Sequence, residues 1–140
     1  MPTLDTYLFF DGNCAEAMRF YERTIGGELQ KIMTYADSPD QHQCSAVNAK
    51  DLVMHACLVL EGRMLMASDT PPDFPKNPRS GFALALNYPT PAEAARIFDT
   101  LGNGGSVTMP MQKTFWAESF GMLTDRFGTA WMIGGGAQAS

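Results

Sequence analysis

The fold is decided by residues 82–102, which read FALALNYPTPAEAARIFDTLG. The first five of them are apolar and predict a strand buried on both faces. A helix should follow Thr90 as N-cap, because Pro91 suits the first helical position and Glu93 lies where a capping box needs it. The apolar residues that come next recur at helical spacing: Ala94, Ile97, Phe98 and Leu101. Gly102 then ends the predicted helix.

The same strand and helix occur near the start of the chain, where residues 7–26 read YLFFDGNCAEAMRFYERTIG. Here Asn13 takes the N-cap position and Glu16 lies three residues further on. The apolar stripe of this helix is predicted to be Cys14, Met18, Tyr21 and Ile25. The two N-cap positions, 13 and 90, are 77 residues apart. The same shift of 77 residues relates a predicted strand at 4–10 to one at 81–87. The chain therefore contains an internal repeat.

Three further strands are expected after each helix. They are 29–35, 52–60 and 63–68 in the first half, and 106–111, 119–124 and 129–133 in the second. The sequence thus predicts an α+β fold of two tandem βαβββ modules, with curved mixed sheets and the helices outside. We expect a single domain, 1–140, made of a first module at 1–68 and a second at 81–133. A Pro-rich linker at 69–80 joins them, and the glycines at 134–136 are interpreted as a frayed terminus.

Composition excludes several classes of protein. The chain has 140 residues, 45% of them hydrophobic, so it is not intrinsically disordered. A net charge of −5 without a basic cluster argues against nucleic-acid binding. No apolar run approaches the roughly 18 residues of a membrane span, and residues 1–5 lack the features of a signal peptide, so we expect a cytoplasmic protein without membrane contact.

The three cysteines are odd in number and irregularly spaced, at Cys14, Cys44 and Cys57. This pattern fits neither a disulfide framework nor a thiolate zinc site. Cys14 and Cys57 lie within apolar patterns and are expected to be ordinary buried thiols, with nucleophilic chemistry as the alternative.

Three stretches resemble a known family: residues 7–14 with Phe20 and Tyr21, residues 65–69, and residues 115–132. Together with the repeated βαβββ order they resemble the vicinal oxygen chelate superfamily of glyoxalase I, extradiol dioxygenases and bleomycin-resistance proteins. Within it they are similar to the PhnB-like branch, often labelled "3-demethylubiquinone-9 3-methyltransferase-like". The resemblance implies a homodimer that binds a small organic molecule. It does not imply a methyltransferase, because the chain lacks a Gly-rich turn between a strand and a helix.

Enzymes of this superfamily commonly hold one divalent metal ion with His, Glu or Gln side chains. The resemblance places the corresponding positions at about Thr6, Ala83, Met132, and Met64 or Met66, all expected on the concave face. None of these side chains suits a hard or borderline divalent ion. Shifting the alignment by one residue would put Asp5 at the position of Thr6. No comparable shift puts a metal ligand at the position of Ala83 or Met132. We therefore expect no metal ligands and no cofactor.

The candidate catalytic residues are His55 and Glu118. His55 interrupts the apolar run 52–59 and shares a strand face with Cys57. The alternatives are a strand histidine bonded to a neighbour or facing solvent, and a solvated loop charge at Glu118. The candidate ligand-binding residues are Gln112, Trp116, Ser119 and Met66.

Other polar residues have simpler interpretations. Trp116 either stacks on a ligand or anchors its loop as a buried indole. His42 is expected at the surface, and Asp69 and Asp125 are expected to hold turns.

Three functions remain open at this point. The first is a small-molecule-binding protein of the glyoxalase/bleomycin-resistance type without the usual metal site. The second is a divalent-metal-dependent lyase or dioxygenase-like enzyme whose ligand set, around His55 and Glu118, differs from that of the superfamily. An interaction domain with a filled core is a third possibility.

Overall fold

The computed structural model describes residues 2–37, 51–71 and 79–137. The chain divides into two compact units, Met1–Asn77 and Pro78–Ser140. Within the described residues, no helix has the length and apolar character to cross a membrane.

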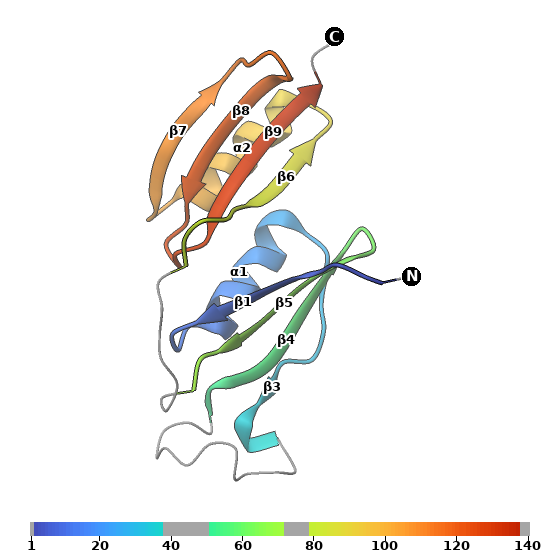
Figure 1. The fold of residues 1–140 in the computed structure, drawn as a ribbon, viewed down its shortest axis with the longest axis vertical. Helices are drawn as coiled ribbons and strands as arrows, with labels where there is room; N and C mark the ends of the chain where they lie inside the picture. Colours follow the sequence, from blue (N-terminus) through green and yellow to red (C-terminus); the bar gives the residue numbers. More distant parts are fainter. Residues whose placement is uncertain (1, 38–50, 72–78, 138–140) are drawn as a thin grey trace. The chain divides into compact units, whose positions relative to one another are not determined.

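The first unit contains one helix and a mixed sheet (Figure 1). Its elements are β1 (Thr6–Phe10), α1 (Cys14–Ile25), β2 (Glu28–Leu29), β3 (Met33–Thr34), a 3-10 turn (Tyr35–Asp37), β4 (Val53–Leu60) and β5 (Arg63–Asp69). The sheet order is β1-β5-β4-β2, and β3 also pairs with β4. Strand β1 runs parallel to β5, whereas the other pairs are antiparallel.

The second unit repeats this arrangement. Its elements are β6 (Leu84–Tyr88), α2 (Pro91–Gly102), β7 (Ser106–Gln112), β8 (Ala117–Thr124) and β9 (Ala130–Ala137). The sheet order is β6-β9-β8-β7, with β6 parallel to β9. The α+β class, the internal repeat and both helices are thus confirmed.

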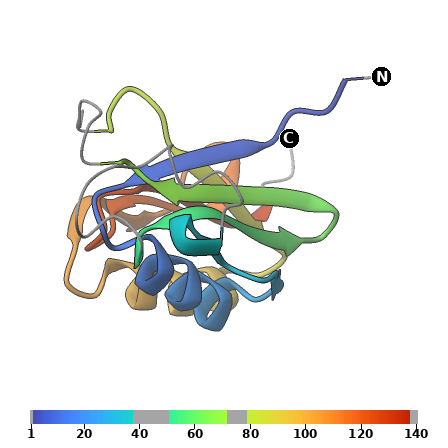
Figure 2. The same ribbon diagram turned by 90° about the horizontal axis from the view of Figure 1, so that it is seen from below.

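Each helix covers one face of its own sheet, as Figure 2 shows for α1. The predicted stripe of α2 is buried in full, and α1 buries Cys14, Ala17, Met18, Phe20 and Tyr21. On the strands, buried residues alternate with more exposed ones, as in Leu8 and Phe10 against Tyr7 and Phe9. We call the face of each sheet that is turned away from its helix the open face.

The strands predicted at 29–35 and from Phe82 differ from the observed ones. The strand expected at 29–35 is broken into β2 and β3, because Leu29 pairs with Leu58 whereas Met33 pairs with His55. The chain therefore inserts one extra residue against β4, as a bulge does. The strand expected from Phe82 begins at Leu84, where pairing with β9 starts, and Phe82 is half exposed.

The interpretation of residues 134–136 as a frayed terminus is wrong. They belong to β9, where Gly135 pairs with Tyr88 on one side and Ser119 on the other. A Cβ atom at Gly135 would lie 2.6 Å from the Cβ atom of Ala94 and 2.7 Å from the carbonyl oxygen of Thr90. Glycine is needed here because β9 passes directly against the start of α2.

The two helices begin in different ways. Thr90 is the N-cap of α2 as predicted: its Oγ1 accepts from the Glu93 N–H at 3.3 Å and donates to the Glu93 carboxylate at 3.2 Å. The Asn13 side chain makes no such bond. Instead, the buried carboxylate of Asp69 accepts from the N–H groups of Cys14 and Val53, each at 2.9 Å. Asp69 was expected only to hold a turn. Its carboxylate instead links β5, on which it lies, to the first residues of α1 and β4.

Asp125 holds its turn, as predicted. Its buried carboxylate accepts from the N–H groups of Phe127 and Thr129 at 2.9 and 3.0 Å, and from Trp131 Nε1 at 2.8 Å. The side chain is thus used for structure.

Candidate functional site

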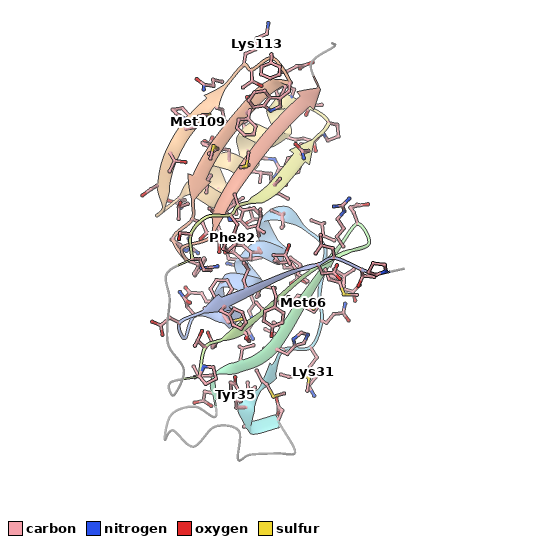
Figure 3. The ribbon with its side chains drawn as sticks, in the orientation of Figure 1. Lys31, Tyr35, Met66, Phe82, Met109 and Lys113 are labelled. Atoms are coloured by element: carbon pink, nitrogen blue, oxygen red, sulfur yellow. The ribbon has the colours of Figure 1, made fainter. Side chains whose placement is uncertain are left out.

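The open face of the first sheet carries two of the predicted site residues, His55 and Met66. On β4, His55 pairs with Met33 and Cys57 pairs with Met66, while Met66 also pairs with Tyr7 of β1. Paired residues share a face, so these side chains lie together; Figure 3 labels Met66 on β5. The Tyr7 hydroxyl lies 3.5 Å from His55 Nδ1, with the two ring centroids 5.9 Å apart.

Cys57 is not the buried thiol that the sequence predicted. It faces this partly exposed surface on β4, whereas Cys14 is fully buried as expected. Desolvation raises the pKa of the Cys57 thiol, and the negative charge of Asp5 raises it further. Both effects favour the neutral thiol, which is a weak nucleophile. Cys44 and His42 lie outside the described residues.

The open face of the second sheet brings Gln112 and Glu118 together. Glu118, Phe120 and Met122 alternate along β8, and Gln112 of β7 pairs with Phe120. Ser119 lies on the opposite, helix-facing side, since it pairs with Gly135. The structure therefore does not bring Ser119 to the other candidates.

Trp116 stands in a short turn just before β8. Thr114 and Ala117 hold this turn: the Thr114 N–H donates to the Ala117 carbonyl, and the Ala117 N–H donates to Thr114 Oγ1, both at 3.1 Å. Trp116 is 49% exposed and Phe115 87%, so the indole is not a buried anchor. The Trp116 ring meets Phe115 and Phe120 edge to face, with centroids 4.8 and 5.2 Å apart. Phe115 and Trp116 thus form an exposed pair of rings, and Trp116 also contacts the buried ring of Phe120.

Glu118 lies on a strand, not on a loop, and its side chain runs over the backbone of Gly136. A Cβ atom placed on Gly136 would lie 2.8 Å from Glu118 Oε2. Among the described residues, none donates a hydrogen bond to this carboxylate or forms an ion pair with it. Glu118 is also the one charged residue in the four strands of the second sheet.

Thr6 was predicted on the concave face, the face turned away from the helix, and this prediction is wrong. Thr6 has the same strand phase as the buried Leu8 and Phe10 and so faces the helix side. Thr6, the first residue of β1, pairs with Leu65, and Leu84, the first residue of β6, pairs with Trp131 in the same way. Strands β1 and β6 are therefore related by a shift of 78 residues, from 6 to 84. The shift exceeds that of the helices by one because the connection 11–13 is one residue longer than 89–90.

The donor set does not fit the superfamily's divalent metal ion. By the strand shift, Ala83 corresponds to Asp5, and alanine supplies no ligand. Met132 pairs with Met122 on the open face and offers only a thioether, which suits soft ions. Within 2–37, 51–71 and 79–137, no three His, Cys, Asp or Glu side chains are grouped so that they could hold a metal ion.

Residues 2–134 match the 3-demethylubiquinone-9 3-methyltransferase family. The chain belongs to this family. It is 39% identical over 140 residues to protein YjdN of Escherichia coli K12, covering 95% of this chain and 94% of that one.

Solved structures agree with membership of the 3-demethylubiquinone-9 3-methyltransferase family. The crystal structure of protein PA1353 from Pseudomonas aeruginosa is 44% identical, with a TM-score of 0.89 over 99% of this chain and all of that one. A putative 3-demethylubiquinone-9 3-methyltransferase, PhnB protein, from Bacillus cereus is 25% identical, with a TM-score of 0.73 over 99% and 100% of the two chains. The PhnB-like resemblance is confirmed.

The fold alone extends further. A glyoxylase/bleomycin resistance protein/dioxygenase domain from Frankia has a TM-score of 0.64 at 14% identity, over 96% of this chain and 98% of that one. At this level of identity the likeness shows a shared fold alone.

Sequence reasoning missed several residues of the two open faces. They are Tyr7, Phe120, Gly136 and Asn87, which pairs with Gly134, together with Phe115 in the turn before β8. The alternation of residues 116, 118, 120 and 122 was a usable signal for Phe120. No local signal points to Gly136, because its contact with Glu118 arises between strands.

Proposed function

We propose that this member of the 3-demethylubiquinone-9 3-methyltransferase family binds a small organic molecule on the open face of its second sheet, without the superfamily's usual metal ion. The observation that carries the proposal is the exposed ring pair of Phe115 and Trp116, together with Phe120, beside Gln112 and Glu118. Exposed aromatic rings grouped with a few polar side chains are typical of ligand sites.

Each group has a distinct role in this proposal. The Trp116 ring offers a stacking surface, and the Gln112 carboxamide offers both a donor and an acceptor. His55 and Met66 line the corresponding face of the first module.

The proposal also covers the organisation of the protein. The modules 1–68 and 81–133, joined by 69–80, make one domain, and two chains form a homodimer in the cytoplasm.

Two-dimensional ¹H–¹⁵N NMR tests the site directly, because the chain has two tryptophans. Trp131 is buried and donates its indole N–H to Asp125, so its signal serves as an internal control. Benzyl alcohol, a neutral aromatic probe, is expected to shift the Trp116 indole signal saturably and to leave that of Trp131 in place. Trp116→Ala should abolish saturable shifts at residues 117–120. A Trp116 signal that stays unchanged up to the solubility limit, with this probe and with charged probes of similar size, would contradict the proposal.

The metal-dependent alternative is separated by metal content. Protein purified without chelators is expected to carry less than about 0.1 divalent ion per chain by elemental analysis, because the donor set suits none. A stoichiometric divalent ion would instead favour a lyase or dioxygenase-like enzyme built around His55 and Glu118.

A further inference from the structure

We infer that the ligand of this site is an organic cation, an amine or ammonium group carried on an apolar body. The inference rests on the proposed function and names the ligand class. It comes from the charge and the ring geometry of the open face of the second sheet.

The four strands of this sheet contain almost no charged side chains. Its four strands contain one charged side chain, Glu118, whereas those of the first sheet contain Glu28, Arg63 and Asp69. No described residue neutralises the Glu118 carboxylate. Lys113 follows the end of β7 and points away from the sheet in Figure 3. Among the residues that the structure describes, Glu118 is therefore the one charged side chain of these strands, and no cation pairs with its carboxylate.

The aromatic rings stand on both sides of this charge along the chain. Trp116 and Phe120 are each two residues from Glu118, and their own ring contact shows that they share its face. The face of an aromatic ring attracts a cation through its quadrupole, and the carboxylate adds a full negative charge. An anion would be repelled by both, and a neutral polar group would gain little from the rings.

The rest of the surface suits an apolar body. Gly134 and Gly136 leave the backbone of β9 without side chains on the open face, and Met122 and Met132 pair beside them. Gly136 has a φ of +73°, a conformation that L residues rarely adopt, and its missing Cβ gives the Glu118 side chain its place. The Glu118 carboxylate therefore lies close to the backbone of β9, where it can contact a molecule bound on that strand.

The test compares three probes of similar size: benzylammonium, benzyl alcohol and benzoate. Each is titrated at pH 7 while the Trp116 indole signal is followed. Benzylammonium is expected to bind about tenfold more tightly than benzyl alcohol, and benzoate more weakly than the alcohol. Glu118→Gln should abolish the tenfold preference for benzylammonium over benzyl alcohol. Asp99→Asn, which removes an exposed negative charge from α2, should preserve the tenfold preference.

The outcomes separate this inference from the function on which it rests. Equal binding of the ammonium and the alcohol, or tightest binding of benzoate, would overturn the cation and leave the small-molecule site standing. A tenfold preference that survives Glu118→Gln would also overturn the inference. Failure of all three probes to shift the Trp116 signal would contradict the proposed function itself.

Discussion

Asp69 accepts hydrogen bonds from two buried N–H groups, those of Cys14 and Val53. Asp69→Ala removes both hydrogen bonds at a site that is 2% exposed. The free energy of unfolding should therefore fall by about 2–5 kcal/mol, measured by urea denaturation with far-UV circular dichroism. Asp69→Asn keeps one acceptor and should lose less. Asp99→Ala, at an exposed position, should change stability by less than about 0.5 kcal/mol. Equal losses for the Asp69 and Asp99 variants would contradict this account.

The raised pKa of Cys57 has a consequence for its reactivity. Because the folded-state pKa lies above the ordinary value, the thiolate is depleted at neutral and mildly alkaline pH. Asp5→Asn removes the smaller of the two causes and keeps an oxygen for the Met64 N–H. Iodoacetamide should then alkylate Cys57 about two- to fivefold faster in a Cys44→Ser background. A rate that is unchanged or lower would show that Asp5 has no such effect.

At the level of single elements, the two helix starts should respond differently to loss of their local N-cap residue. Thr90→Ala removes a side-chain cap and should destabilise the protein by about 1 kcal/mol, with Thr90→Ser restoring most of the loss. Asn13→Ala should change stability by less than about 0.5 kcal/mol, because its side chain caps nothing. The measurement is again urea denaturation. A larger loss for Asn13→Ala than for Thr90→Ala would contradict the assignment of caps.

The glycines of β9 give a matched pair within one element. Gly135→Ala drives a Cβ atom into the backbone at the start of α2 and should cost about 3 kcal/mol or more. Gly134→Ala meets the end of the flexible Asn87 side chain at 3.0 Å and should cost about 1 kcal/mol or less. Thermal unfolding of both variants measures the difference. Similar costs would mean that β9 does not lie tightly against α2.

How far the sequence predicts each element depends on where its contacts come from. Both helices follow from local periodicity, and α2 also from its local cap. The burial of Gly135 and the capping by Asp69 depend on residues far along the chain, so no local pattern shows them. For the site, Gln112 and Glu118 do share a face, and strict alternation from Trp116 would have excluded Ser119. Thr6 was misplaced because one extra loop residue shifts the strands relative to the helices.

At the scale of the whole molecule, the described surface carries large exposed apolar side chains. They include Phe9, Met64, Phe82, Phe115 and Trp116. Covering such a surface favours association, so we predict a two-fold dimer that buries more than about 1,000 Å² in total, the area expected of a specific interface. Light scattering at micromolar concentration is expected to give twice the 15.3 kDa of the chain. A 15.3 kDa particle would refute the dimer.

The contrast between the two helix caps also sets an order of events during synthesis. Cys14 and its acceptor Asp69 are separated by 55 residues, whereas Thr90 and Glu93 are separated by three. A chain that leaves the ribosome from its N-terminus thus releases all of α1 well before the residue that secures its first turn. Helix α2 emerges with its cap already beside it. We therefore expect the first turn of α1 to gain its Asp69 cap only after β5 has left the ribosome, whereas α2 can form its Thr90 cap as soon as Glu93 has emerged.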